Sequence, residues 1–270
     1  MEVNIDKIVV VLNELDMAEI LLQRAFSFAS ERDAVVEVLY VHKKPMFSVP
    51  DFFRLKKGVE DDTLDKEKIK QSIKDTISKI ENSKECAIFV FVDDTVSRVL
   101  ALVKDDKKIL IITPYHQKIT QNLVKKIHLP ILVIKNEYSK YKNILLYLNV
   151  DSRSDECVLQ TKDFFSNSKI RLLYDYRYIV DPSIDIDLQN IQEIEKIQRE
   201  SFEKLKKKSA LDGDFFVDSS FFGDSLIKYL QKKEYDLVIV CTHQDDFIIA
   251  DSIMLELLQN LSTDTLVCAK

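Results

Sequence analysis

Two histidines occupy matching places in the chain and are the first candidates for chemistry. His116 follows the apolar run 108–113, and His243 follows the similar run 237–241. An imidazole titrates near neutral pH, so a histidine at the end of a buried strand can contact a ligand or carry a proton. The alternative is that each is a polar loop residue that recurs because the chain is duplicated. The sequence leaves both interpretations open.

Patterns typical of catalytic and metal sites are missing. No serine lies in a Gly-x-Ser-x-Gly elbow, and no GxxxxGK[ST] loop is present. His243 with Asp245 or Asp246 is the most compact set of metal-ligand types, and such alternation is common by chance. We therefore expect neither catalysis nor a bound metal.

The cysteines are expected to be chemically idle. They are scattered without a CxxC pair or a metal-like spacing, at positions Cys86, Cys157, Cys241 and Cys268. Most of them follow or lie within strand-like stretches. We expect buried thiols in a reducing cytoplasm.

Glycine is scarce, which bears directly on ligand binding. The chain has three glycines, whereas average usage would give about 19 in 270 residues. Loops that wrap their backbone N–H groups around a phosphate normally need glycine, because the chain must come close to the ligand. Few such loops can therefore exist here.

Charge and hydropathy exclude two classes of partner. The formal net charge is −6, with no basic cluster of the kind that marks a nucleic-acid interface. No apolar run approaches the roughly 20 residues that span a bilayer. Acidic residues flank the short apolar run near the N-terminus, so we expect no signal peptide and no membrane attachment.

Strands and helices alternate along the chain, and their order occurs twice. The first half predicts strands over 7–12, 35–41, 87–92, 108–113 and 130–135, with helices over 15–29, 64–80, 96–103 and 119–127. The second half predicts strands over 144–148, 170–176, 214–217, 237–241 and 265–268, with helices over 156–165, 188–208, 225–231 and 253–261. Alternation of this kind predicts parallel sheets covered by helices.

Short sequence matches support an internal duplication. Leu12-Asn13 ends the first strand of one half, and Leu148-Asn149 ends it in the other. Phe91-Val92-Asp93 recurs as Phe216-Val217-Asp218. We therefore predict two tandem repeats, over residues 1–137 and 138–270.

The layout resembles a tandem universal stress protein. The resemblance covers nearly the whole chain. Besides the apolar opening strand that ends in a polar residue, it rests on Phe222-Gly223-Asp224-Ser225-Leu226-Ile227, which opens a short helix, and on the strand Tyr235-Asp236-Leu237-Val238-Ile239-Val240. This family implies an adenine nucleotide alpha hydrolase-like α/β fold. Each repeat would hold a five-stranded parallel sheet of order 3-2-1-4-5. It also implies that the repeats pair through their fifth strands as an internal pseudo-dimer.

The resemblance also implies a place for ATP, across the carboxyl ends of strands one and four. The family motif there is G-x2-G-x9-G-(S/T). The matching residues are 113–118 in the first repeat and 241–246 in the second, and neither stretch contains glycine. Asp251-Ser252 stands where Gly-Ser would open the last helix. Asp245, Asp246 and Asp251 would add negative charge beside a triphosphate.

The resemblance therefore implies a small set of candidate ligand-binding residues. Asn13 and Asn149 stand where the family's aspartate follows the first strand, with Asp16 and Asp151 close by. His116 and Lys118 in the first repeat, and His243 and Ser252 in the second, lie near the expected phosphate positions. Lys118 and the adjoining helix start make the first repeat the better place for an anion.

We interpret the chain as a cytoplasmic, non-catalytic stress-response or regulatory protein. It would act through protein contacts, with a partner protein or as a homodimer, and its nucleotide sites would be lost or altered. No cofactor is expected. The alternative is a binding module for ATP, AMP or another small ligand that uses a remodelled pocket in one half.

Overall fold

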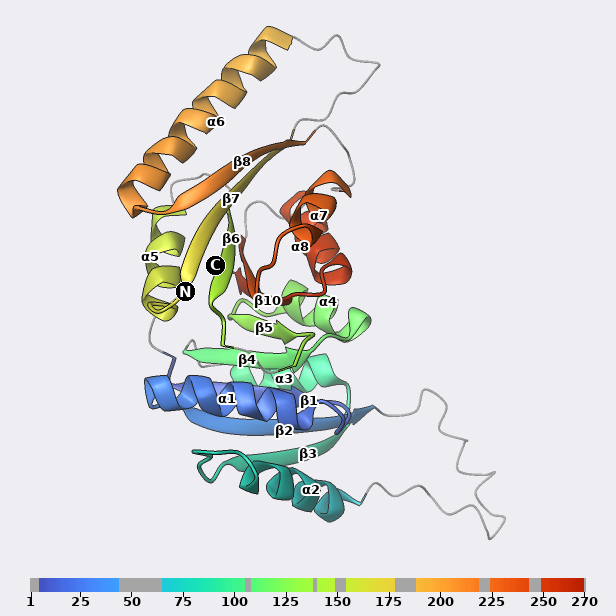
Figure 1. The fold of residues 1–270 in the computed structure, drawn as a ribbon. Coiled ribbons are helices and arrows are strands. Elements are labelled where there is room, and N and C mark those ends of the chain that lie inside the picture. Colours follow the sequence, from blue (N-terminus) through green and yellow to red (C-terminus); the bar gives the residue numbers. More distant parts are fainter. Residues whose placement is uncertain are drawn as a thin grey trace, which may run out of the picture. The chain divides into compact units, whose positions relative to one another are not determined.

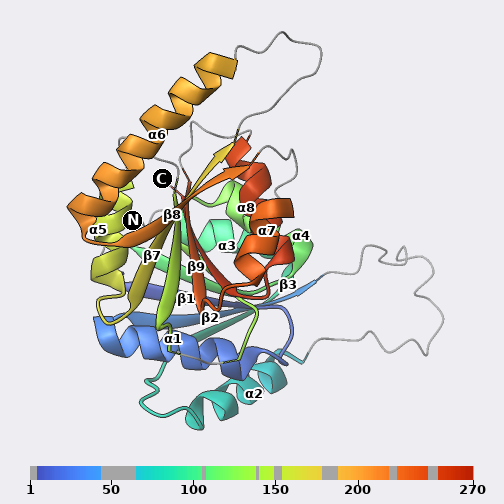
Figure 2. The ribbon, with the colours of Figure 1, turned by 45° about the horizontal axis from the view of Figure 1, so that its top comes forward.

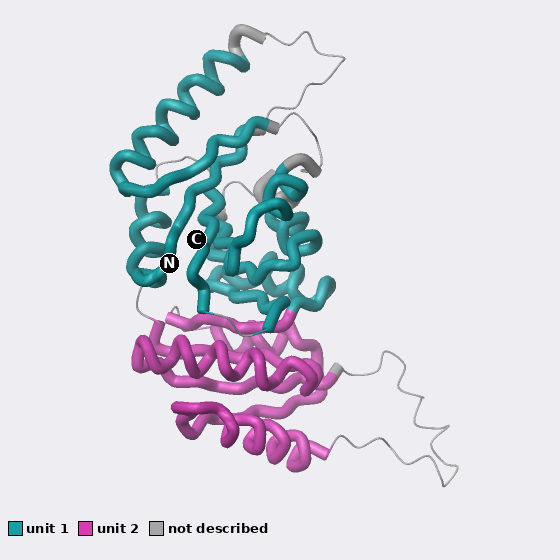
Figure 3. The backbone as a smooth tube through the Cα atoms, in the orientation of Figure 1, with its two compact units in different colours: residues 1–4, 115–270 teal, residues 5–114 magenta. Residues whose placement is uncertain are grey.

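The computed structural model describes residues 5–43, 65–104, 108–137, 140–148, 154–177, 188–218, 224–242 and 249–269. Strands and helices alternate through these ranges in the predicted order. The chain divides into two compact units, coloured in Figure 3: unit 2 holds residues 5–114, and unit 1 holds residues 115–270 with the first four residues. None of the described helices combines the length and the apolarity needed to span a bilayer.

The described residues of unit 2 form four parallel strands in the order β3-β2-β1-β4. Its elements are β1 (Lys7–Leu12), α1 (Ala18–Arg32), β2 (Val35–Lys43), α2 (Lys66–Ser78), β3 (Ala87–Asp93), α3 (Thr95–Val103) and β4 (Ile109–Pro114). In register, Ile8 lies opposite Val36 on one side and Leu110 on the other. All three side chains are buried, which explains why these strands read as continuous apolar runs.

Where it is described, unit 1 has six strands in the order β5-β10-β9-β6-β7-β8 (Figure 1). Its elements are α4 (Gln117–Lys126), β5 (Ile131–Ile134), β6 (Asn143–Leu148), α5 (Ser154–Phe164), β7 (Lys169–Arg177), α6 (Leu188–Ser209), β8 (Asp212–Asp218), α7 (Asp224–Gln231), β9 (Leu237–Thr242), α8 (Ile249–Asn260) and β10 (Asp264–Ala269). The five strands β8-β7-β6-β9-β10 are parallel and follow the predicted order 3-2-1-4-5. Helices α5 and α6 lie on one side of these strands, and α7 and α8 lie on the other (Figure 2).

The last helix and strand of the first half belong to unit 1. Strand β5 pairs with β10 in antiparallel orientation, with Leu132 opposite Leu266. Helix α4 contacts α8. These contacts explain why the unit boundary falls after Pro114. The repeats, with their boundary between residues 137 and 138, are defined by duplication of the sequence, whereas the units are defined by compactness. The repeat boundary stays a prediction.

One buried carboxylate ties the end of β5 to the start of β10. Asp264 is only 1% exposed. Its Oδ1 accepts hydrogen bonds from the backbone N–H groups of Lys135, at 2.8 Å, and Asn136, at 3.0 Å. Its Oδ2 accepts one from the hydroxyl of Tyr141, at 2.7 Å. The two chain segments are thus joined by charge-assisted hydrogen bonds in addition to the strand ladder.

Aromatic side chains fill the space between α6 and the sheet. The ring of Tyr174 lies 6.1 Å from that of Phe202 and 5.1 Å from that of Phe215. Gly213 pairs with Leu172 on the neighbouring strand and lies under the Phe202 ring. A Cβ atom at Gly213 would meet the Phe202 ring at 2.9 Å, so the helix can lie this close to the sheet because position 213 has no side chain.

Candidate ligand site at the carboxyl ends of the strands

Asn13 follows β1 and holds neighbouring segments of unit 2 together. Its Nδ2 donates to the carbonyl oxygen of Val41 in β2, at 2.9 Å, and to Oγ1 of Thr95 at the start of α3, at 2.8 Å. Both N–H groups of the amide nitrogen are thus used within the fold. An aspartate here could not make these two bonds, because a carboxylate has no hydrogen to donate.

The aspartates at the end of β3 are structural. The side chain of Asp94 caps α3, since its Oδ1 accepts from the backbone N–H of Ser97 at 2.9 Å. Asp93 pairs with Arg98 at 2.6 Å, and the Arg98 guanidinium lies over the ring of Phe91. The first turn of α3 is therefore closed by its own neighbours.

The other predicted residues of the first repeat lie in different units. Asp16 is exposed in the turn before α1, in unit 2. His116 and Lys118 are exposed at the start of α4, in unit 1. The side chain of His116 does not cap this helix, although its backbone N–H donates to Oγ1 of the buried Thr120 at 2.9 Å. The first turn of α4 thus combines a cationic side chain with backbone N–H groups.

The predicted residues of the second repeat are largely outside the described ranges. Asn149, Asp151 and His243 lie outside them altogether. Ser252 belongs to α8, but its side chain is not among those described. In the described part of the chain, no group of three histidine, cysteine or acidic side chains could hold a metal ion.

Lys135 directly follows β5, and the sequence did not predict a role for it. Its Nζ donates to the carbonyl oxygens of Leu258 and Leu261, at the carboxyl end of α8. The same ammonium lies 4.6 Å from the ring centre of Tyr115, which follows β4. A cation at the carboxyl end of a helix complements its dipole. Lys135 therefore holds the end of α8 in place, although Leu258 lies 123 positions later in the chain.

The proton affinity of Lys135 is unusual. Burial lowers the pKa of its amine to about 8, and the nearby charge of Asp264 only partly offsets this. In the unfolded chain the amine keeps its ordinary pKa, so between pH 8 and about 10.4 the unfolded state binds more protons. Folding stability contributed by this group must therefore rise with pH across that window.

We expect the free energy of unfolding of the wild type, relative to Lys135→Met, to increase by about 1 kcal/mol from pH 7.5 to pH 10, because the ammonium is only half-buried and solvent screens part of the effect. Urea denaturation of both proteins at several pH values measures this difference, and titrations common to both cancel. A difference that stays constant over the window would contradict the proton linkage assigned to Lys135.

A second charged cluster lies on the α7 side of unit 1. Arg171 donates to both carboxylate oxygens of Asp214, at 2.9 and 2.7 Å. The hydroxyl of Tyr229 donates to Oδ2 of the same carboxylate, at 2.5 Å. The hydrogen bond from Arg171 is the main cause that lowers the pKa of Asp214 to about 2. Because Arg171 and Tyr229 both donate to Asp214, these hydrogen bonds hold α7 against the sheet.

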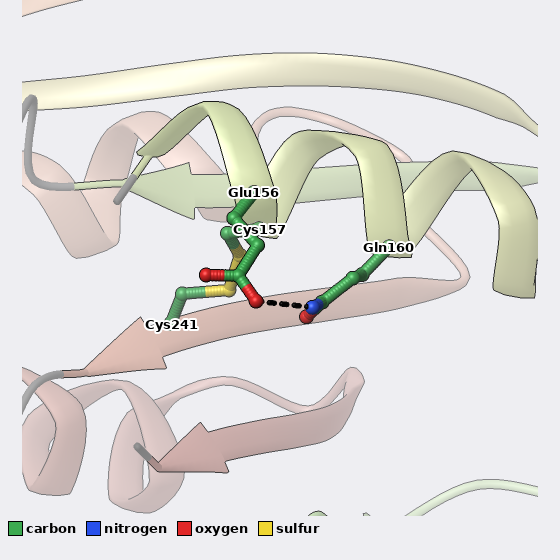
Figure 4. Close-up of a disulfide and its surroundings, with 4 residues drawn as sticks. All are labelled: Glu156, Cys157, Gln160 and Cys241. Atoms are coloured by element: carbon green, nitrogen blue, oxygen red, sulfur yellow. Dashed lines mark hydrogen bonds between the residues drawn. A yellow bond between two sulfur atoms is a disulfide. The ribbon is translucent and has the colours of Figure 1, made fainter. Parts of the chain in front are cut away.

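Two of the cysteines are bonded, which corrects the expectation of four idle thiols. Cys157 in α5 and Cys241 near the end of β9 form a disulfide (Figure 4). The linear spacing of 84 residues gave no signal for this pair, because the fold alone brings α5 over the end of β9. Cys86 and Cys268 are outside this bond.

Comparison with known proteins rests on structure. No protein-family model matches the sequence, and no curated protein sequence matches it. A functionally unknown protein from Pseudomonas aeruginosa PAO1 is 15% identical, with a TM-score of 0.62 over 99% of this chain and 93% of that one. A putative universal stress protein from Pseudomonas aeruginosa UCBPP-PA14 gives the same identity and TM-score, over 99% and 94% of the two chains.

A third solved structure extends the likeness to another organism. The universal stress protein from Archaeoglobus fulgidus DSM 4304 is 8% identical, with a TM-score of 0.58 over 99% of this chain and 97% of that one. These likenesses cover both halves of the chain. They confirm that it has the tandem α/β fold of universal stress proteins.

Proposed function

We propose that this chain is a cytoplasmic, non-catalytic regulatory protein of the stress-response type, which acts through protein contacts. Its ordinary ATP sites would be lost or altered. The tandem fold supports the type of protein, and the residues at the carboxyl ends of the strands support the change of function.

The observation that carries the proposal is the engagement of Asn13. This residue stands where the resemblance implies an acidic ligand contact. Its amide nitrogen instead donates both of its hydrogens, to the carbonyl oxygen of Val41 and to Oγ1 of Thr95. A residue that holds β2 and α3 in place is poorly suited to turn toward a nucleotide. The stretch that follows β4, residues 113–118, adds no glycine with which a loop could approach a phosphate.

Exposed apolar side chains favour protein contacts. In α6, Ile194 is 42% exposed and Ile197 is 54% exposed, and both lie on the part of the helix that precedes the buried Phe202. Neighbouring exposed apolar groups on a helix are typical of surfaces that meet another protein. The antiparallel pair of β5 and β10 would be the internal seam of a pseudo-dimer. Other partners, including a second copy, would then bind elsewhere on the surface.

The first turn of α4 favours one alternative, a module that binds a small anion such as AMP or ATP. Lys118 is exposed there, and the side chain of His116 leaves the helix start uncapped. Such a site would use a remodelled pocket in the first repeat, rather than the glycine loop implied by the family motif.

We expect titration with ATP or AMP, followed by calorimetry, to give no saturable heat at ligand concentrations up to about 1 mM, which corresponds to a binding free energy weaker than about −4 kcal/mol. Incubation with ATP is also expected to yield no ADP, AMP or pyrophosphate. Tight saturable binding would contradict the loss of the nucleotide sites, and product formation would contradict a non-catalytic role.

A matched variant separates the two candidate functions. If a nucleotide binds through α4, Lys118→Ala should weaken it, whereas Lys125→Ala, in the last turn of the same helix, should not. Native mass spectrometry of the purified chain reports any co-purified ligand directly. Binding that Lys118→Ala abolishes would establish the alternative.

A further inference from the structure

Three cysteines of unit 1 lie at adjoining positions. Cys157 and Cys241 form the disulfide between α5 and β9. Cys241 pairs in register with Cys268 on the neighbouring parallel strand β10. All three residues are buried. Cys241 therefore has Cys157 above it in the covering helix α5, and Cys268 beside it on the next strand of the sheet.

The separation of the two strands suits a second disulfide. Neighbouring strands lie about 4.8 Å apart, and residues paired in register point to the same face. Disulfides join Cα atoms about 4.4 to 6.8 Å apart. The existing bond joins Cα atoms 6.8 Å apart, at the upper end of that range. A bond from Cys241 to Cys268 would therefore meet the same Cα criterion.

We propose that Cys157, Cys241 and Cys268 form a thiol–disulfide exchange site, in which Cys241 can be bonded to either of the other two. The thiol of Cys268 loses its proton to water, and the thiolate attacks Sγ of Cys241. The bond between Cys241 and Cys157 breaks as the new bond forms. Its electron pair leaves on Sγ of Cys157, which then takes up a proton. One disulfide and one thiol remain, so no external oxidant or reductant is needed.

The exchange would release the beginning of α5 from β9. Apart from the disulfide, α5 contacts mainly α6 and β6. The matching helix of the first half, α1, is longer, and it contacts β1, β2 and β4 without any covalent link. Leu21 occupies in α1 the place that Cys157 occupies in α5, and it is fully buried. At this one position the first half thus has a buried leucine, and the second half has a cysteine whose bond can be exchanged.

The position of the site gives the exchange a consequence at the carboxyl edge of the second repeat. Cys157 lies in the first turn of α5, and Cys241 is the next-to-last residue of β9. A change of partner at Cys241 alters how the beginning of α5 is held. Disulfides in cytoplasmic proteins are usually transient or redox-sensing rather than permanent. The proposal of an exchange site does not depend on whether the second repeat binds a ligand.

Disulfide mapping of the intact chain tests the proposal. The folded protein is incubated at pH 8.5, its thiols are blocked with N-ethylmaleimide at low pH, and the non-reduced peptides are analysed by mass spectrometry. We expect two isomers, one with Cys157 bonded to Cys241 and one with Cys241 bonded to Cys268. In the second, Cys157 should carry the label. Failure to detect the Cys241–Cys268 peptide in the folded wild type would overturn the proposal.

Variants identify the exchanging thiol. Cys268→Ser should keep the Cys157–Cys241 bond and give no second isomer. Cys157→Ser, oxidised with glutathione disulfide, should form the Cys241–Cys268 bond. Cys86→Ser is the matched control, because Cys86 lies in unit 2, and it should give both isomers as the wild type does. Loss of the second isomer in Cys86→Ser would overturn the assignment of Cys268 as the attacking thiol.

A further measurement tests whether a change of partner at Cys241 releases α5. In the Cys157→Ser protein, amide hydrogen exchange within residues 154–164 should be at least tenfold faster than in the Cys268→Ser protein, while exchange within α1 should be equal in both. Equal rates for residues 154–164 in the two proteins would contradict the release of α5.

Discussion

Replacing Asp264 by alanine is expected to lower the free energy of unfolding by about 3 to 5 kcal/mol. The carboxylate accepts hydrogen bonds from the N–H groups of Lys135 and Asn136 and from the Tyr141 hydroxyl. Removing it takes this acceptor from all of these donors, and among them the Tyr141 hydroxyl is buried. Urea denaturation followed by circular dichroism measures the loss.

The asparagine variant refines the same test. Asp264→Asn keeps one oxygen for the two backbone N–H groups, and its amide can donate to the Tyr141 hydroxyl. We therefore expect a loss of about 1 to 2 kcal/mol, clearly smaller than for alanine. Asp163→Ala, at an exposed position of α5, should change stability by less than about 0.5 kcal/mol. If Asp264→Ala proves as mild as Asp163→Ala, the buried carboxylate does not hold the two strands together.

The second large effect is expected at Gly213. In Gly213→Ala the new Cβ would lie 2.7 Å from both Cβ and the carbonyl oxygen of Leu172, and 2.9 Å from the Phe202 ring. One of these contacts is with backbone, so a change of rotamer cannot relieve it. Either β8 or α6 must move, at a cost of about 3 kcal/mol.

A neighbouring position supplies the control for Gly213→Ala. Asp212 precedes the glycine in β8 and is exposed, so Asp212→Ala should be nearly neutral. Thermal unfolding of the two variants measures the difference. We also expect Gly213→Ala to weaken the near-ultraviolet circular dichroism signal, because the stacked rings of Tyr174 and Phe202 would be displaced. Equal stability of the two variants would show that the strand accepts a side chain at position 213.

Much of the fold follows from local pattern. The run at Lys7–Leu12 and its counterpart at Asn143–Leu148 are strands, because apolar residues on both faces suit only a sheet covered by helices. The long helix predicted over 188–208 is α6, Leu188–Ser209. Differences at the ends of elements are small. Asp94, for example, caps α3, and the helix then begins one residue earlier than its apolar stripe indicates.

The candidate site could be predicted only in part. The place of Asn13 at the end of β1 follows from the sequence, but its partners Val41 and Thr95 are 28 and 82 residues away. The role of Lys135 depends on α8, and the disulfide depends on the packing of α5 over β9. Each of these is a contact between segments distant in the chain. Periodicity carries information about neighbours in sequence, and therefore none about such pairs.

The antiparallel pair of β5 and β10 sets a limit on how the chain can be cut. A fragment beginning at Lys140 would keep β10 but lose β5, so the backbone groups that now face Ile131 and Val133 would be left without partners. Asp264 would lose its donors at Lys135 and Asn136 at the same time. Such a fragment would gain by borrowing β5 from an intact molecule or by joining its open edge to another copy. Strand exchange and aggregation are therefore the expected behaviour of the isolated second half.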